Sequence, residues 1–113
     1  MRRGDVWLIN LDPTVGAEIK KTRPAVIVND DAVGILPLKV IVPVTEWKDR
    51  YAVAPWMVPL IPDAENGLDK PSAADTFQVR SLSQSRFVQQ LGRLSEIAMQ
   101  EIGRALAVVL AID

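Results

Sequence analysis

The distribution of proline divides this chain into two unequal parts. All eight prolines lie within the first 71 residues, and the last 42 residues contain none. Proline lacks the backbone N–H and interrupts helices, so it is common between short strands and rare inside helices. The pattern therefore predicts a body of short strands followed by a C-terminal helix.

Short apolar segments support this division. Those rich in β-favouring residues predict six strands, at residues 5–11, 24–29, 40–45, 56–61, 76–82 and 87–94. Such strands, separated by Pro, Gly, Asn and Asp, are typical of a small barrel or sandwich. Ser95 is a suitable N-cap, and a helical apolar stripe follows it, formed by Ala98, Ile102, Ala105, Leu106 and Val109. We expect residues 1–113 to form one mainly β domain, with a helix at 95–110 covering one side.

The chain contains neither cysteine nor histidine. This composition excludes disulfides, thiolate nucleophiles, cysteine zinc sites, Ser-His-Asp triads and almost all transition-metal sites. Acid–base chemistry would have to use carboxylates, Arg, Lys, hydroxyls or Tyr51.

Charge is balanced overall but segregated along the sequence. The formal net charge is −1 and the pI about 5.4. These values exclude a protein whose whole surface is cationic and binds nucleic acid through that overall charge. Three cations nevertheless lie within residues 20–23, and residues 76–95 hold three arginines and no acid. The longest apolar run, residues 105–112, is too short to span a bilayer, and no apolar leader segment is visible, so we expect a cytoplasmic protein without a membrane partner.

Several segments together carry a family resemblance. They are Arg3-Gly4-Asp5-Val6-Trp7, Leu11-Asp12-Pro13-Thr14-Val15-Gly16-Ala17-Glu18, Lys21-Thr22-Arg23-Pro24-Ala25-Val26-Ile27-Val28, Val42-Pro43-Val44-Thr45 and Gln78-Val79-Arg80-Ser81-Leu82. The chain resembles the MazF/PemK family of toxins, the effector halves of type II toxin–antitoxin modules, and is closer to the MazF branch. The similarity extends from residue 3 into the C-terminal helix, and its densest part is residues 4–28.

The resemblance implies a fold, an activity and partners. The fold would be a small SH3-like β-barrel with a terminal helix, working as a homodimer. The activity would be sequence-specific, metal-independent cleavage of single-stranded RNA, with no cofactor. Attack by the 2′-hydroxyl would leave a 2′,3′-cyclic phosphate and a 5′-hydroxyl. The protein partner would be a cognate antitoxin whose acidic or apolar tail occupies the RNA groove.

The resemblance also implies a catalytic pair. Positions matching Arg23 and Thr45 are regarded as catalytic in the MazF branch. Because a guanidinium is effectively never deprotonated, Arg23 is better suited to stabilising charge on phosphorus than to moving a proton. The Thr45 hydroxyl could donate to a phosphate oxygen, and we expect Glu18 to orient Arg23 or to accept the 2′-OH proton. The alternatives are structural: a solvated arginine, a strand-ending threonine, and a glutamate that neutralises neighbouring lysines.

RNA-binding side chains are expected in the polar loops and in the arginine-rich segment. We expect this role for Lys20, Lys21, Trp47, Lys48, Arg50, Asp75, Gln78 and Arg80. The sequence departs from the PemK branch at Phe77, where that branch has an acid, and at Ala17, where it has a histidine. Asp75 could replace the missing acid or could only cap a turn.

A homodimer would need an apolar shared surface. The candidate residues for it are Val58, Leu60, Val108, Val109 and Leu110.

Two other functions stay open: a CcdB-type gyrase poison without catalytic activity, and a non-enzymatic SH3-like binding module. The ending Leu110-Ala111-Ile112-Asp113 lacks the Trp-Gly-Ile of the CcdB type, which disfavours the gyrase poison. The chain has six aromatic residues, which are few for a groove that binds proline-rich ligands.

Overall fold

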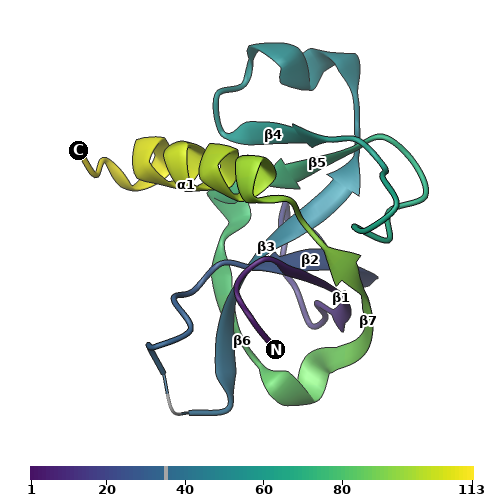
Figure 1. Ribbon diagram of the computed structural model, residues 1–113, viewed down its shortest axis with the longest axis vertical. Helices are drawn as coiled ribbons and strands as arrows, with labels where there is room; N and C mark the ends of the chain where they lie inside the picture. Colours follow the sequence, from purple (N-terminus) through teal and green to yellow (C-terminus); the bar gives the residue numbers. More distant parts are fainter. Residues whose placement is uncertain (35) are drawn as a thin grey trace.

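The computed structural model describes residues 1–34 and 36–113 (Figure 1). Its strands are β1 (Asp5–Asn10), β2 (Thr22–Ile27), β3 (Leu38–Glu46), β4 (Met57–Leu60), β5 (Ser72–Asp75), β6 (Arg80–Ser83) and β7 (Phe87–Arg93). One α-helix, α1 (Glu96–Leu110), and three 3₁₀ helices (Asp49–Val53, Thr76–Gln78 and Gln84–Arg86) complete the described elements. Among the described residues, no helix combines the length and apolar character needed to cross a bilayer.

The strands form one antiparallel sheet in the order β4-β5-β3-β2-β1-β7, with β6 paired to β3. The long strand β3 joins the two halves of this sheet. Its first part pairs with β6 and β2, and its last three residues pair with β5. In Figure 1, β4 and β5 lie beside α1, whereas β1, β2 and β7 form the other half. The result is the mainly β fold with a C-terminal helix that the sequence predicts.

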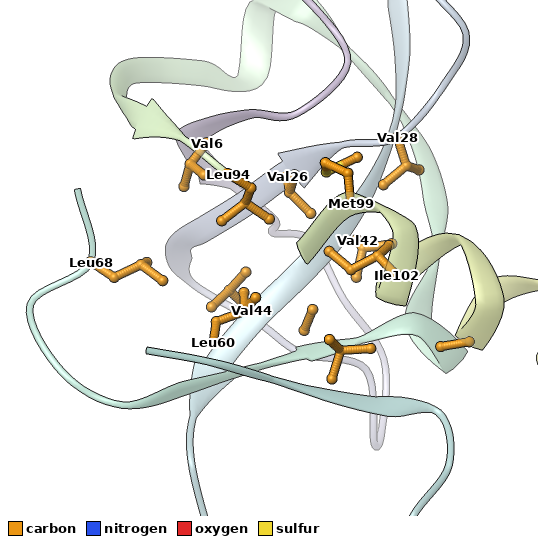
Figure 2. Packing of buried hydrophobic residues seen from close by; sticks show 13 residues of the cluster. Val6, Val26, Val28, Val42, Val44, Leu60, Leu68, Leu94, Met99 and Ile102 are labelled. Atoms are coloured by element: carbon orange, nitrogen blue, oxygen red, sulfur yellow. The ribbon is translucent and has the colours of Figure 1, made fainter. Parts of the chain in front are cut away.

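The main apolar core lies between the sheet and α1 (Figure 2). Val6, Val26 and Val42 come from three neighbouring strands and are fully buried, and α1 adds Ile102. The adjacent residues along the strands point to the opposite face, where a second cluster is built from Ile9, Leu11, Ala25, Ile27, Ile41 and Leu82. Because both faces of the central strands are buried, these strands form a rigid base for the loops at their ends.

The expected helix is confirmed. The Ser95 side chain accepts a hydrogen bond from the Ala98 N–H at 3.1 Å, which caps the first turn. Of the expected stripe, Ile102 and Ala105 are buried, and Met99, which was not part of it, is buried as well.

The expected strand at residues 76–82 is wrong in its first half. The chain turns there through a short 3₁₀ helix, because the Asp75 carboxylate accepts the Phe77 N–H at 3.2 Å and the Thr76 hydroxyl donates to the Trp56 carbonyl at 2.6 Å. The strand before it, β5, begins at Ser72 and lies outside the six expected strands. Local side-chain hydrogen bonds outweigh the β propensity of this segment.

Two of the expected dimer-surface residues are also placed wrongly. Val58 and Leu60 belong to the main core, since alternate residues of β4 point inward against α1 and β5. Val108 and Leu110, by contrast, are exposed near the end of the helix.

Candidate functional site

A cavity of about 520 Å³, here called the Arg23 cavity, brings Arg23 and Thr45 together. The two residues are 22 positions apart in the sequence, but they lie on the neighbouring strands β2 and β3. Residues 67–70 of the loop between β4 and β5 form another part of the lining, and Leu91 contributes from β7. The pairing of strands therefore places a guanidinium and a hydroxyl at one cavity.

The Arg23 guanidinium is fixed at one nitrogen. Its Nε donates to the Lys20 carbonyl at 2.9 Å, and within the described part of the chain no hydrogen bond engages Nη1 or Nη2. The backbone is fixed by pairing with Ile9 on β1 and by the φ restriction of Pro24. Arg23 thus presents two terminal nitrogens, and a guanidinium edge matches the oxygens of a phosphate.

Thr45 stands near the end of β3, opposite Ala73 of β5. Its side chain is half-buried, and among residues 1–34 and 36–113 its hydroxyl has no hydrogen-bond partner. The small methyl group of Ala73 lies in the pairing position, so the strand itself fixes Thr45. The hydroxyl is therefore a donor that a bound anion can use.

Lys21 also lines the Arg23 cavity and has an unusual backbone, with φ at 71°. A side chain other than glycine seldom adopts this left-handed conformation. Two contacts hold it there: the Lys21 N–H donates to Asp12 Oδ1 at 3.2 Å, and the Leu11 N–H donates to the Lys21 carbonyl at 3.0 Å. Strain of this kind is concentrated at functional sites, where surrounding structure imposes it.

Two carboxylates line the same cavity. Glu46 lies 3.7 Å from the Lys70 ammonium, and both side chains are more than half exposed, so this pair adds little stability. No cation engages the second carboxylate, that of Asp69, anywhere in the described ranges. The cavity therefore holds cations that suit the binding of a phosphate and a carboxylate that suits the acceptance of a proton.

A tight backbone contact holds the loop that lines this cavity. A Cβ at Gly67 would lie 2.1 Å from the Leu91 carbonyl oxygen, and a Cβ at Gly92 would lie 2.2 Å from the Glu65 carbonyl oxygen. The Arg93 N–H donates to that same Glu65 carbonyl at 2.8 Å. Only glycine at both positions permits this approach. Residues 67–70 were not among the expected site residues, although an Asn-Gly pair at 66–67 marks a turn there.

Glu18 does not orient Arg23, which was the first of its two expected roles. Its Oε1 accepts the Val15 N–H at 2.5 Å, and the Lys20 carbonyl takes the orienting position instead. Glu18 lines a second cavity, of about 480 Å³, here called the Phe77 cavity. Ile19 lines the Phe77 cavity as well, whereas Lys21 lines the Arg23 cavity, so residues close in sequence belong to two different cavities.

Gln78 and Arg80 also line the Phe77 cavity, where each makes contacts with the chain itself. Gln78 accepts the Ile19 N–H at 2.6 Å and donates to the Ala17 carbonyl at 3.2 Å. Arg80 donates to the Leu11 carbonyl at 3.3 Å. These bonds fasten the loop between β1 and β2 to β6 and to the 3₁₀ helix before it.

Asp75 is buried, with 6% of its surface exposed, which contradicts its expected role as an RNA contact. Burial raises the pKa of its carboxyl, and hydrogen bonds from Phe77 and Gln78 oppose that rise. Of the two possibilities left by the sequence, the turn cap is the one observed.

The remaining expected RNA contacts lie outside both cavities. The Trp47 ring packs edge-to-face with Tyr51 at 5.9 Å, and the Arg50 guanidinium stands over the Tyr51 ring at 5.4 Å. Lys48 is exposed beside them, and Lys20 contributes its carbonyl to Arg23 while its side chain is solvated.

An antiparallel sheet with a C-terminal helix, and a cavity that carries cations and hydroxyls from β2 and β3, defines a small, mainly β protein with a candidate site for an anion. Residues 2–110 match the family described as PemK-like, MazF-like toxin of type II toxin-antitoxin system, and the chain belongs to that family.

Named relatives agree with this assignment. Endoribonuclease MazF9 of Mycobacterium tuberculosis is 32% identical over 112 residues, with 94% of this chain and 92% of the relative covered. Endoribonuclease MazF of Staphylococcus saprophyticus is 34% identical over 112 residues, with 99% and 92% covered. The crystal structure of MazF from Deinococcus radiodurans superposes with a TM-score of 0.81 at 26% identity and covers 98% of this chain and 96% of its own.

Structures of complexes share the fold as well. The MazE-MazF structure from Deinococcus radiodurans (Form-II) has a TM-score of 0.75 at 25% identity, covering 100% of this chain and 97% of its own. Membership of the toxin family, with relatives named endoribonucleases, disfavours the gyrase-poison and binding-module alternatives.

Proposed function

We propose that the Arg23 cavity is the RNA-cleaving centre of this chain. The family and the curated relatives make the chain an endoribonuclease toxin of a type II toxin–antitoxin system. The observation that carries the proposal is the meeting of Arg23 and Thr45, from different strands, at one cavity.

The chemistry is attack of a ribose 2′-oxygen on the adjacent phosphorus. The bond from the 2′-oxygen to phosphorus forms while the bond from phosphorus to the 5′-oxygen breaks. A proton leaves the 2′-hydroxyl and another joins the 5′-oxygen, which gives a 2′,3′-cyclic phosphate and a 5′-hydroxyl. The atoms and charges of this reaction balance without a metal ion, an oxidant or a reductant.

The residues of the cavity fit the separate tasks. Arg23 Nη1 and Nη2 stabilise the charge that develops on the phosphoryl oxygens, and the Thr45 hydroxyl donates to one of them. Asp69, the carboxylate without a cation among the described residues, accepts the 2′-OH proton. Lys21 adds positive charge where the phosphate would bind.

The substrate and partners belong to the same proposal. Single-stranded RNA enters the cavity, and the exposed cations Lys20, Lys48 and Arg50 contact neighbouring phosphates with salt-dependent affinity. A cognate antitoxin covers the Arg23 cavity with an acidic or apolar tail. Two copies of the chain associate as a homodimer in the cytoplasm. The MazE-MazF complex from Deinococcus radiodurans supports the antitoxin part.

Primer extension on a long RNA, treated with the protein in the presence of EDTA, tests the proposal. Wild-type protein should cut at defined sites and leave products without a free 2′-hydroxyl. Arg23→Ala should lower the rate by about 10²- to 10³-fold, the scale for losing one transition-state donor. Asp69→Asn should slow cleavage with little effect on RNA binding.

Arg104→Ala is the matched control, because Arg104 is an exposed arginine of α1 outside both cavities. It should cut at the wild-type rate. Wild-type rates from Arg23→Ala, or cleavage that appears only after a metal is added, would contradict the proposed mechanism.

A further inference from the structure

The Phe77 cavity has the composition of a site for a flat, mostly apolar ligand. Phe77 is 68% exposed although it belongs to a largely apolar lining with Ile19 and Val79. The Arg80 guanidinium and the Glu18 carboxylate add one group of each charge. A concave apolar surface with a few polar groups at its edge is the usual composition of a ligand site.

The Phe77 ring is held by an aromatic neighbour. Its centroid lies 6.1 Å from that of Trp56, at an interplanar angle of 74°. In this edge-to-face arrangement Trp56 supports the ring and limits its rotation. The backbone is fixed as well, because the Phe77 N–H donates to Asp75 in the 3₁₀ turn. The exposed ring is therefore a preorganised stacking surface.

The Phe77 cavity adjoins the Arg23 cavity. Pro43 belongs to the first and Thr45 to the second, and residues two apart on β3 point to the same face of the sheet. Their Cα atoms are about 7 Å apart at the rise of an extended strand. The β1–β2 loop connects the same two places, since Ile19 lines one cavity and Lys21 the other.

We propose that the Phe77 cavity binds one unpaired nucleobase of the RNA, that of a nucleotide next to the cleaved phosphate. This inference rests on the proposed function of the Arg23 cavity. Single-stranded RNA is recognised by splaying its bases onto aromatic rings, and strand β3 and the β1–β2 loop place such a ring beside the Arg23 cavity. The base stacks on Phe77 while its phosphate lies at Arg23.

The polar groups indicate which bases fit. Glu18 uses Oε1 for the Val15 N–H, and in the described part of the chain Oε2 accepts no hydrogen bond. A carboxylate accepts from the exocyclic amino group of a base, which uracil lacks. The bound base is therefore cytosine, adenine or guanine, and Phe77 and Glu18 are specificity-determining residues of this toxin.

Binding to a short oligonucleotide tests the inference. The oligonucleotide carries the site mapped by primer extension, with a 2′-O-methyl group at the cleaved nucleotide so that it stays intact. Two further versions have an abasic residue at one or the other neighbour of the cleaved phosphate. Dissociation constants come from the anisotropy of a fluorescent end label, for wild type, Phe77→Ala, Phe77→Tyr and Val88→Ala.

Phe77→Ala should weaken binding by about 5- to 100-fold, the range for losing one base–aromatic stack. Phe77→Tyr should bind like wild type, and so should Val88→Ala, which removes an equally exposed apolar side chain from β7. With the abasic residue at the correct neighbour, wild type and Phe77→Ala should bind equally. A merely structural role of Phe77 would instead weaken binding to every version alike.

Failure of the proposed function and failure of this inference give different results. Wild-type protein that cuts no RNA overturns the proposed function and this inference with it. Cleavage by wild type, combined with equal binding by Phe77→Ala and Val88→Ala, overturns the inference alone. A mapped site with uracil on both sides of the cut also contradicts it.

Discussion

Gly92→Ala provides a sharp test of how the Arg23 cavity is held together. The new Cβ would lie 2.2 Å from the Glu65 carbonyl oxygen, 2.6 Å from the Asn66 carbonyl carbon and 2.8 Å from the Gly67 nitrogen. All three are backbone atoms, so no side chain can rotate away. The loop must move off β7, and with it the part of the cavity lining at residues 67–70.

The cost follows from two effects. Overpacking against backbone costs about 1–3 kcal/mol, and loss of the hydrogen bond from the Arg93 N–H to the Glu65 carbonyl costs about 0.5–1.5 kcal/mol. We therefore expect Gly92→Ala to lower the free energy of unfolding by about 2–4 kcal/mol. For a chain of this size the melting temperature should fall by about 8–16 °C.

Gly103→Ala is the matched control, because the same atom is added in open surroundings. The nearest heavy atom to its Cβ would be the end of the Arg3 side chain at 3.9 Å, and Gly103 lies inside α1. Alanine there should stabilise the protein by about 0.5–1 kcal/mol. Thermal unfolding followed by circular dichroism measures both variants, and RNA cleavage at 25 °C should fall in Gly92→Ala only. Equal melting temperatures of Gly92→Ala and wild type would refute the proposed backbone contact.

Three further predictions concern stability and are measured by chemical denaturation. Ser95→Ala should cost about 1 kcal/mol through loss of the helix cap. Asp5→Ala should cost about 1–3 kcal/mol, because its buried carboxylate accepts from Arg93 at 2.8 Å, whereas Lys70→Ala, in an exposed pair, should cost less than about 1 kcal/mol. Asp75→Asn should alter the pH dependence. Burial raises the pKa of Asp75 above its ordinary 3.8, so the folded wild type binds the proton more tightly than the unfolded chain. Wild-type stability should fall as pH rises from 3.8 through the raised pKa and then level off, and the variant should lack that fall.

Much of the fold follows from local pattern. Proline spacing and β-branched segments locate most strands, and a serine cap with a helical apolar stripe locates α1. The failures occur where a side chain takes over a backbone hydrogen bond. Asp75 and Thr76 turn the chain after β5, and the sequence offers no measure of whether such a bond or the strand propensity prevails. Burial of Val58 and Leu60 similarly depends on which side of β4 meets α1.

The arginines show why the candidate site was only partly predictable. The stretch that holds Arg80, Arg86 and Arg93 has the composition of an RNA-binding segment, yet each of these side chains donates to this chain's own carbonyls or to Asp5. Their partners lie 69 to 90 positions away in the sequence, and they come near only in the folded sheet. Arg23 differs because its single hydrogen bond is local and uses Nε, so its two terminal nitrogens are left for a ligand. The residue type indicates an anion site, but the cavity at which an arginine's free donors lie decides whether that arginine can form one.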